Sequence, residues 1–381
     1  MISVSVLYAR RYKSHHDIFP LRVHQSKLEK MNIKLSFYND LDKNTLKADA
    51  VLISSYQANE CFRLFARKNN IGLEKNNYLP VINFIRNSGV SVIWFDTSDT
   101  SSIEFPNLFE NVDLYLKQQV LKQAENSKGA FNNSNLYYDY FYGIIDKSKI
   151  QKTSKNQKNH NNFRLGWNLA LSDWKIHSKN RLIRGLNIIF PSISNNLNFH
   201  EKPLKNRRKN LWFFAKSKGH IINDYHRNLL INSIKGYNDK FNLTNYNCST
   251  MKYSQYTKLL RETAVVPSPF GLGEICYRDF EILFSGCVLI KPNMDHLETW
   301  PNIYKPMKTY IPCNWDFSDL EEKVSWVFSN FSEAQTIAMN GQNYIKNILL
   351  QGNNFTYYFK NIVDTALKDL NLKTVMDEQN P

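Results

Sequence analysis

The strongest constraint on the fold is a series of short, almost continuous apolar runs separated by longer segments. Two of these runs, at residues 48–54 and 90–95, read ADAVLIS and VSVIWF. Such runs are typical of strands buried on both faces, as in a parallel sheet. Further strand patterns lie at residues 2–8, 33–38 and 112–116. The first half therefore predicts a doubly wound α/β domain.

A second α/β unit is predicted after a polar segment. Residues 196–210 (NLNFHEKPLKNRRKN) are polar and charged and contain Pro203, as is typical of interdomain boundaries. Strand patterns follow at residues 211–215, 264–267, 288–291 and 309–312, and helical patterns at 225–234, 275–284, 319–330, 333–349 and 355–370. We predict an N-terminal domain over residues 1–204, with a polar excursion at about 131–162, and a C-terminal domain over residues 205–355.

The composition fits this organisation but does not identify a binding partner. The chain has 381 residues, 42% of them apolar, which is enough for two cores. Lys and Arg number 49 against 34 Asp and Glu, a net charge of +15. Such an excess suits nucleic acid or an anionic membrane, but it also suits the solvated surface of a Lys- and Asn-rich chain, which we favour.

The sequence gives no sign of export or of a membrane span. The five cysteines lack metal-ligand spacing and are odd in number, which fits reduced thiols. The N-terminus lacks the order of a signal peptide, and no run of about 18 apolar residues occurs. We expect a cytoplasmic protein, with peripheral contact at the inner face of the plasma membrane, through the basic surface, as an alternative.

Residues 267–292 (PSPFGLGEICYRDFEILFSGCVLIKP) carry the clearest chemical pattern, a strand, a loop, a helix and a strand. Gly271 and Gly273 let the backbone of the loop approach a ligand closely. A helix that starts after the loop presents free N–H groups and the positive end of its dipole, which favours phosphate. Glu274 would complement that dipole where no anion is bound.

Arg278 and Glu281 are three residues apart and so lie on one face of the predicted helix. A guanidinium suits a diphosphate, and a carboxylate suits the two hydroxyls of a ribose. The alternative is an ordinary surface ion pair, which would contribute a few tenths of a kcal/mol. Spacing alone does not decide between these two hypotheses.

The same residues resemble the donor-binding domain of GT-B glycosyltransferases, particularly the exostosin-like and bacterial family-one-like enzymes. In those families a basic residue, two further residues, a Glu and a turn ending in Gly precede the next strand, as do Arg278, Glu281 and Gly286 here. The resemblance implies two Rossmann-like domains facing a cleft, with a C-terminal helix from about residue 356 packing back on the first domain. It also implies that Arg278 meets the donor diphosphate and Glu281 the ribose.

This sequence departs from the retaining enzymes of the class, in which seven residues separate two Glu. Six residues separate Glu274 from Glu281, so the resemblance assigns a role to Glu281 only and leaves open whether Glu274 touches the sugar. We predict donor contacts at Phe270, Gly271, Gly273, Glu274, Arg278 and Glu281.

Other candidates follow the predicted strands. Lys216 and Lys218 lie in a loop that in GT-B enzymes faces the cleft, and either could contact the diphosphate; a solvated loop is the alternative. Asp96 follows a buried strand and is a candidate base for the acceptor hydroxyl, although turn formation by Asp is commoner. His16, in the loop after the first strand, is the second candidate base, with a surface histidine as its alternative.

Together these patterns predict a metal-independent glycosyltransferase that needs no cofactor beyond its nucleotide-sugar donor. The expected acceptor is a glycan or a lipid-linked precursor in cell-surface polysaccharide synthesis. Two rival hypotheses are an inactive nucleotide-sugar-binding scaffold and a nucleic-acid-binding protein. We find no nucleic-acid-binding motif and expect no nucleic-acid partner.

Overall fold

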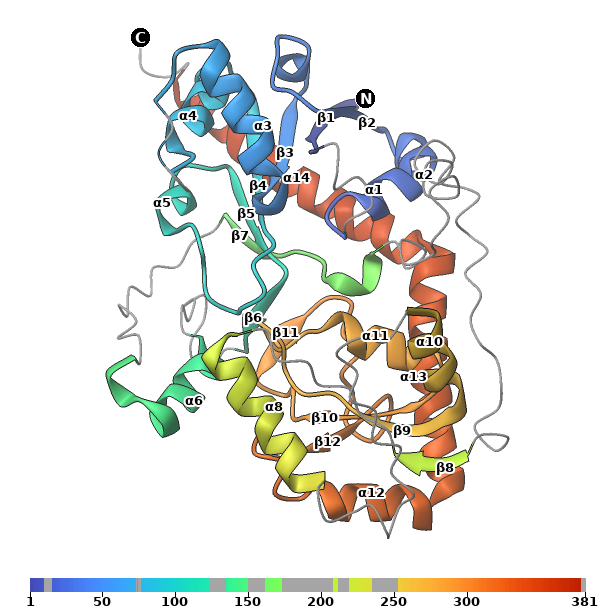
Figure 1. Ribbon diagram of the computed structural model, residues 1–381. Coiled ribbons are helices and arrows are strands. Elements are labelled where there is room, and N and C mark those ends of the chain that lie inside the picture. The colour runs from blue at the N-terminus through green and yellow to red at the C-terminus, as the bar shows by residue number, and fades with distance from the viewer. Residues whose placement is uncertain are drawn as a thin grey trace. The chain divides into compact units, whose positions relative to one another are not determined.

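The computed structural model contains two compact units. The first comprises Met1–Asn133, Ser154–Asn196 and Gln351–Pro381, and the second comprises Ser134–Thr153 and Leu197–Leu350. The structure describes residues 1–9, 16–72, 74, 77–122, 135–149, 162–172, 208–211, 219–234 and 253–377. Each unit is built on its own parallel sheet (Figure 1), so the predicted α/β class is confirmed.

The first unit holds a six-stranded parallel sheet in the order β2-β1-β3-β4-β5-β7. Its strands are β1 (Ile2–Leu7), β2 (Ile33–Tyr38), β3 (Ala50–Ser54), β4 (Ser91–Asp96), β5 (Leu114–Lys117) and β7 (Phe163–Leu165), and β6 (Gln119–Leu121) lies outside this sheet. Its helices are α1 (Phe19–Val23), α2 (Gln25–Lys30), α3 (Ser55–Lys68), α4 (Leu79–Asn87), α5 (Pro106–Phe109) and α14 (Asn353–Asp377). Every residue of β3 and β4 is buried, as their apolar sequences predict.

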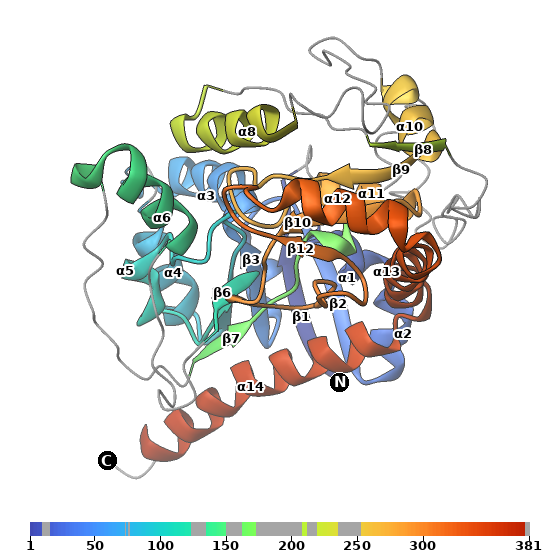
Figure 2. The same cartoon turned by 90° about the horizontal axis from the view of Figure 1, so that it is seen from below.

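Alternate residues of the central strands pack against different helices, because successive side chains point to opposite faces of a sheet. Val51 and Trp94 join the core formed with α3 and α4. On the other face lies α14, seen beneath the sheet in Figure 2, which contacts β3 and β4. Phe355 of α14 packs on Trp167, and Trp167 packs on Phe95 of β4. The C-terminal helix thus belongs to the first unit.

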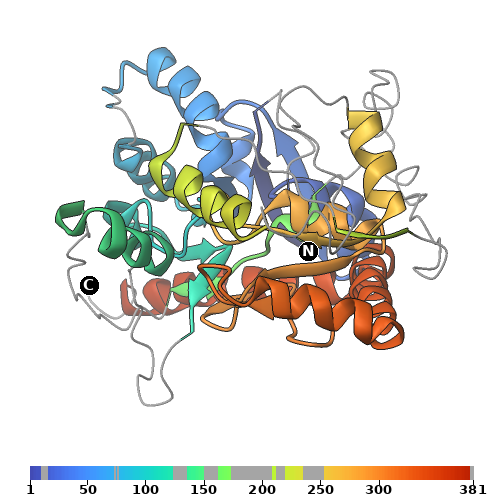
Figure 3. The ribbon, with the colours of Figure 1, turned by 60° about the horizontal axis from the view of Figure 1, so that its bottom comes forward.

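The second unit holds a four-stranded parallel sheet in the order β12-β10-β9-β8. Its strands are β8 (Arg208–Leu211), β9 (Thr263–Pro267), β10 (Val288–Pro292), β11 (Leu297–Thr299) and β12 (Ile311–Cys313). Its helices are α6 (Leu136–Ile145), α8 (Ile221–Ile234), α10 (Tyr253–Glu262), α11 (Tyr277–Phe284), α12 (Leu320–Ser329) and α13 (Phe331–Gln351). Figure 3 shows α10, in gold, beside β9, which it contacts.

Three assignments from the sequence need correction. Residues 134–153, which we placed in an excursion of the N-terminal domain, belong to the second unit and contain α6. The physical reason is that Tyr137 and Phe141 of α6 are fully buried against the ring of His226. The strand predicted from residue 211 starts at Arg208, within the predicted linker, and residues 212–218 lie outside the described part of the chain. The third correction is small: the helix predicted over residues 319–330 is α12, which begins at Leu320 and has Asp319 as its N-cap residue. No helix in the described part of the chain is both long and apolar enough to span a membrane.

Candidate functional site

The second unit places the predicted donor residues that the structure describes in one loop and in the helix that follows it. This loop runs from Ser268, after β9, to Cys276, the N-cap residue of α11. Tyr137 Oη donates to the Gly271 carbonyl over 3.3 Å, and Tyr138 Oη donates to the Leu272 carbonyl over 2.8 Å. A Cβ at Gly271 would lie 3.0 Å from Cys276 Sγ, closer than most side-chain contacts. The two tyrosines of α6 and the tight turn therefore fix the shape of the loop.

Phe270 lies beneath this loop and not on its surface. Its side chain is 0% exposed, and its ring contacts Tyr137, His226 and Trp315. The Phe270 N–H donates to His226 Nδ1 over 3.3 Å, and burial lowers the pKa of His226 to about 3. The imidazole is therefore a neutral acceptor at pH 7, and the Phe270 side chain supports the loop from below. The donor contact predicted at Phe270 stays a prediction, and the burial of its ring leaves that contact to the backbone.

Arg278 of α11 and Arg227 of α8 are two cations of the second unit that influence one another. Arg227 of α8 is 5% exposed. Burial lowers the pKa of Arg227, and the charge of Arg278 lowers it further, so the two guanidinium groups act on one another electrostatically. Among the described residues, Arg278 Nη1 is buried and has no hydrogen-bond partner. Two neighbouring cations of this kind favour a bound anion that offers several oxygens, such as a diphosphate.

Glu281 bonds to a tyrosine and not to Arg278. Tyr256 Oη of α10 donates to Glu281 Oε2 over 2.7 Å. Burial raises the pKa of Glu281 to about 7, although Tyr256 and Arg278 act in the opposite direction. In the part of the chain that the structure describes, no ion pair joins Arg278 to Glu281. The geometry therefore disfavours the surface ion-pair hypothesis and leaves both groups able to bind a ligand.

Glu281 should make the stability of the second unit depend on pH. A carboxyl whose pKa is about 7 when folded, against an ordinary 4.5, binds more protons in the folded state between these values. The free energy of unfolding should therefore decrease as the pH rises from about 4.5 to about 7. Urea unfolding at several pH values should show that Glu281→Gln removes this part of the decrease. Glu262→Gln, at an exposed position on α10, is the control, and equal pH slopes for wild type and Glu281→Gln would contradict the prediction.

A buried ion pair under the loop was not predicted from the sequence. Asp279 and Lys291 are both 0% exposed, and Lys291 Nζ lies 3.0 Å from Asp279 Oδ2. The carboxylate also accepts hydrogen bonds from Ser268 Oγ (2.6 Å), Tyr304 Oη (2.7 Å) and the Cys276 N–H (3.1 Å). It thereby links the end of β9, the start of α11 and the end of β10. The signal in the sequence was Lys291 at the end of an otherwise apolar strand.

Glu274 does not lie at the helix start as predicted. The α11 helix begins at Tyr277, and its first-turn carboxylate is Asp279. Glu274 is 0% exposed, and its Oε1 atom lies 3.5 Å from His296 Nε2. Asp279 therefore takes the role of complementing the dipole that we assigned to Glu274. The structure places Glu274 beside the loop that follows β10.

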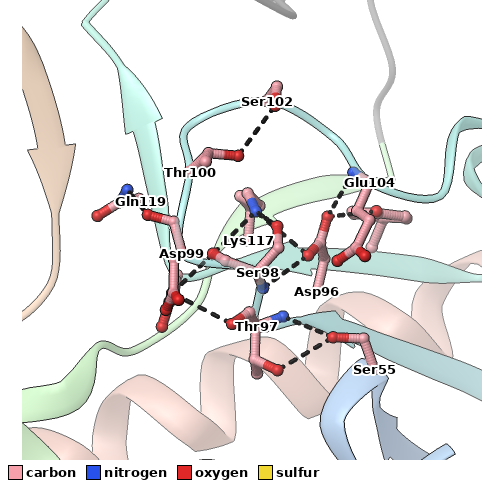
Figure 4. Close-up of polar contacts among 12 residues, drawn as sticks. Ser55, Asp96, Thr97, Ser98, Asp99, Thr100, Ser102, Glu104, Lys117 and Gln119 are labelled. Atoms are coloured by element: carbon pink, nitrogen blue, oxygen red, sulfur yellow. Dashed lines mark hydrogen bonds and ion pairs between the residues drawn. The ribbon is translucent and has the colours of Figure 1, made fainter. Parts of the chain in front are cut away.

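Asp96, the first candidate base, lies in a dense network of the first unit (Figure 4). Its side chain is 0% exposed and pairs with Lys117 Nζ at 3.2 Å. It accepts from Tyr115 Oη (2.8 Å) and from the N–H groups of Ser98 and Glu104 (3.0 Å each). Burial alone would raise its pKa, but Lys117 and the two N–H groups hold that pKa below its usual value. This geometry favours turn formation, the alternative weighed above for Asp96.

His16, the second candidate base, lies near the carboxyl ends of β3 and β4. The next residue, Asp17, accepts hydrogen bonds from Ser54 Oγ and from Gln57 Nε2, the latter over 3.0 Å. The His16 ring packs edge-on to Phe95, and its carbonyl accepts from Trp167 Nε1 over 2.7 Å. The imidazole is only 1% exposed, so it is not the surface histidine of the alternative hypothesis.

Lys216 and Lys218 lie outside the described residues. Within the described ranges, no three His, Cys, Asp or Glu side chains are grouped so that they could hold a metal ion.

Comparisons with known proteins agree with the predicted resemblance. Residues 274–378 match the profile of Glycosyl transferase family 90. Protein O-glucosyltransferase 2 of Danio rerio is 34% identical over 84 residues, which are 22% of this chain and 17% of that protein. Protein O-glucosyltransferase 3 of Homo sapiens is 30% identical over 84 residues, with the same coverage. The chain thus aligns with about a sixth of the length of these curated relatives.

Two solved structures show a more distant likeness over most of the chain. One is an alpha-glucosyltransferase in complex with UDP, with 11% identity and a TM-score of 0.46, covering 95% of this chain and 100% of that one. The other is Anabaena HepE in complex with UDP-glucose, with 8% identity and a TM-score of 0.41 at the same coverage.

Proposed function

We propose that this chain is a glycosyltransferase that moves a sugar from a nucleotide-sugar donor to a hydroxyl acceptor. The observation that carries the proposal is the position of Arg278 and Glu281. Both side chains project from α11, neither is paired with the other, and both lie within the range that matches family 90. The donor would bind to the second unit at this helix.

The donor diphosphate would lie against Arg278 and Arg227. Transfer breaks the bond between the anomeric carbon and the diphosphate oxygen, so negative charge develops on the departing nucleoside diphosphate. Two fixed cations in a partly buried site stabilise that charge more strongly in the transition state than in the donor. We propose that these guanidinium groups, and not a metal ion, do so.

The ribose would lie against Glu281. An ionised carboxylate accepts two hydroxyl hydrogen bonds, and the Tyr256 hydroxyl holds one of its oxygens in place. Because the pKa of Glu281 is about 7 without ligand, ribose hydroxyls that donate to it should lower that pKa and release protons on binding. We propose that Gly271 and Gly273 allow the loop to approach the donor.

The acceptor is proposed to be a glycan or lipid-linked precursor of a cell-surface polysaccharide, used in the cytoplasm with peripheral contact at the membrane. The names of the curated relatives favour a second candidate, a hydroxyl group on a protein. Of the two candidate bases in the first unit, we propose that His16 deprotonates the acceptor hydroxyl. Asp96 already accepts three hydrogen bonds and forms an ion pair with Lys117.

Thermal unfolding with UDP, GDP, CDP, ADP and dTDP, each with and without EDTA, tests the donor site. A ligand at about 100 times its dissociation constant adds about 2.7 kcal/mol of stability. We expect a clear shift with one nucleotide that EDTA does not change. A shift that EDTA abolishes would contradict metal independence, and no shift with any nucleotide would contradict the donor site.

An activity assay with the nucleotide sugar of the base selected in this way, with UDP-glucose tried first, then distinguishes a glycosyltransferase from the two rival hypotheses. Transfer to an acceptor or slow hydrolysis of the donor is expected of a glycosyltransferase. Binding with neither reaction would favour an inactive scaffold. Affinity for DNA or RNA that falls steeply with salt, without nucleotide binding, would favour the nucleic-acid hypothesis.

A further inference from the structure

An open hollow on the second unit lies outside the donor site described above. It has a volume of about 380 Å³ and is lined by Leu136, Tyr140, Asn314, Trp315 and Asp316. This volume is within the usual range of about 300–1,000 Å³ for small-molecule sites. Leu136 and Tyr140 belong to α6, and the other three lining residues follow β12.

Two aromatic rings form a corner in this hollow. The rings of Tyr140 and Trp315 lie 5.1 Å apart at 75°. The Tyr140 side chain is 42% exposed. Trp315 is held from behind, because its Nε1 donates to the Asn293 carbonyl over 3.0 Å and its ring packs on Phe270 at 5.4 Å. A rigid corner of this kind suits a flat, partly apolar ring more than a flexible chain.

The polar groups at the rim favour a ligand rich in hydroxyls. Asn314 and Asp316 are both exposed. One Asp316 oxygen accepts from the Ser318 N–H over 3.0 Å, and this bond keeps the pKa of Asp316 below its usual value. The ionised carboxylate can accept from hydroxyls, whereas it repels phosphate. A nucleotide or an anionic lipid headgroup therefore fits this rim poorly.

We propose that the hollow binds one pyranose ring of a neutral glycan, with an apolar face of the sugar on Tyr140 and Trp315 and its hydroxyls toward Asn314 and Asp316. The inference rests on the proposed function, because it identifies the glycan as part of the acceptor. Trp315 also contacts Phe270, under the donor loop, and His296, beside Glu274. A sugar in the hollow would therefore be a neighbour of the donor within the same unit.

Saturation-transfer NMR on the full chain tests this proposal, with the methyl glycosides of glucose, galactose, mannose, xylose and N-acetylglucosamine as probes. At least one glycoside should receive magnetisation, and Tyr140→Ala should weaken its binding about tenfold. Tyr140 is 42% exposed and lies outside the buried core, so the variant should remain folded. Tyr357→Ala, at a 65% exposed tyrosine of α14, is the matched control and should bind like the wild type.

The outcomes separate this inference from the donor site. If no glycoside binds, or if Tyr140→Ala binds it as well as wild type does, the hollow is not a sugar site. UDP affinity should be the same in wild type and Tyr140→Ala, and a loss of UDP affinity would assign the hollow to the donor nucleotide and overturn the proposal. Failure of all five nucleoside diphosphates to bind to wild type, with glycoside binding intact, would contradict the proposed donor site and not the hollow.

Discussion

Arg278→Ala is expected to weaken binding of the nucleoside diphosphate that the thermal screen selects, with UDP as the first probe, by about tenfold to a hundredfold, the usual cost of removing a charge-assisted hydrogen bond. The charge of Arg278 acts on Arg227, and in the described chain the Arg278 Nη1 atom has no hydrogen-bond partner. Its removal should take away an anion contact and relieve the repulsion of Arg227. Titration calorimetry with UDP would measure the change in affinity, and thermal unfolding without ligand should show a fold at least as stable as the wild type.

Arg261→Ala provides the control for this change. Arg261 is exposed at the end of α10 in the same unit, so its removal changes the net charge equally without touching the proposed site. UDP affinity within about twofold of wild type is expected for this variant. Equal losses in the two variants would mean that Arg278 acts only through net charge, and no loss in Arg278→Ala would contradict our placement of the diphosphate.

Lys291→Met is expected to destabilise the second unit by about 3–5 kcal/mol, because it leaves Asp279 as a buried charge without its partner. Methionine fills a similar volume, so the effect should come from the charge and not from a cavity. Urea unfolding followed by circular dichroism would measure it. The variant should also lose UDP affinity, since Asp279 connects the strand ends to the start of α11.

The matched control is Lys323→Met, which removes a lysine that pairs with Asp319 and Glu322 near the surface. Exposed pairs of this kind contribute about 0–1 kcal/mol. A loss in Lys291→Met as small as that in Lys323→Met would show that the buried pair is not needed for stability.

The sequence predicted those parts of the fold that depend on local pattern. Continuous apolar runs identified β3, β4, β9 and β10, because a strand covered on both faces admits few polar residues. The pattern failed for α6. The tyrosines of α6 and the asparagines that precede it resemble a loop, and only contacts with residues about 90 positions away, such as His226, show that it is part of the second core.

The candidate site, like the fold, was predictable from the sequence only in part. The spacing of Arg278 and Glu281 was sufficient to place both on one helix. Tyr256, which bonds to Glu281, and Arg227, on which the charge of Arg278 acts, come from other helices. The burial of Asp96 was also not readable, because the Lys117 that pairs with it lies on the neighbouring strand, 21 residues later. Periodicity reports a residue's own element and carries no information about partners from distant elements.

The discontinuity of the first unit has a consequence for biosynthesis. Its sheet is made of residues up to Leu165, but α14, which covers β3 and β4, begins at Asn353. Chains emerge from the ribosome N-terminus first, and domains generally fold as units. The second unit, Leu197–Leu350, is therefore fully synthesised before the helix that closes the first. Until then Trp167 lacks its cover by Phe355, so the nascent chain carries an apolar surface that molecular chaperones can recognise.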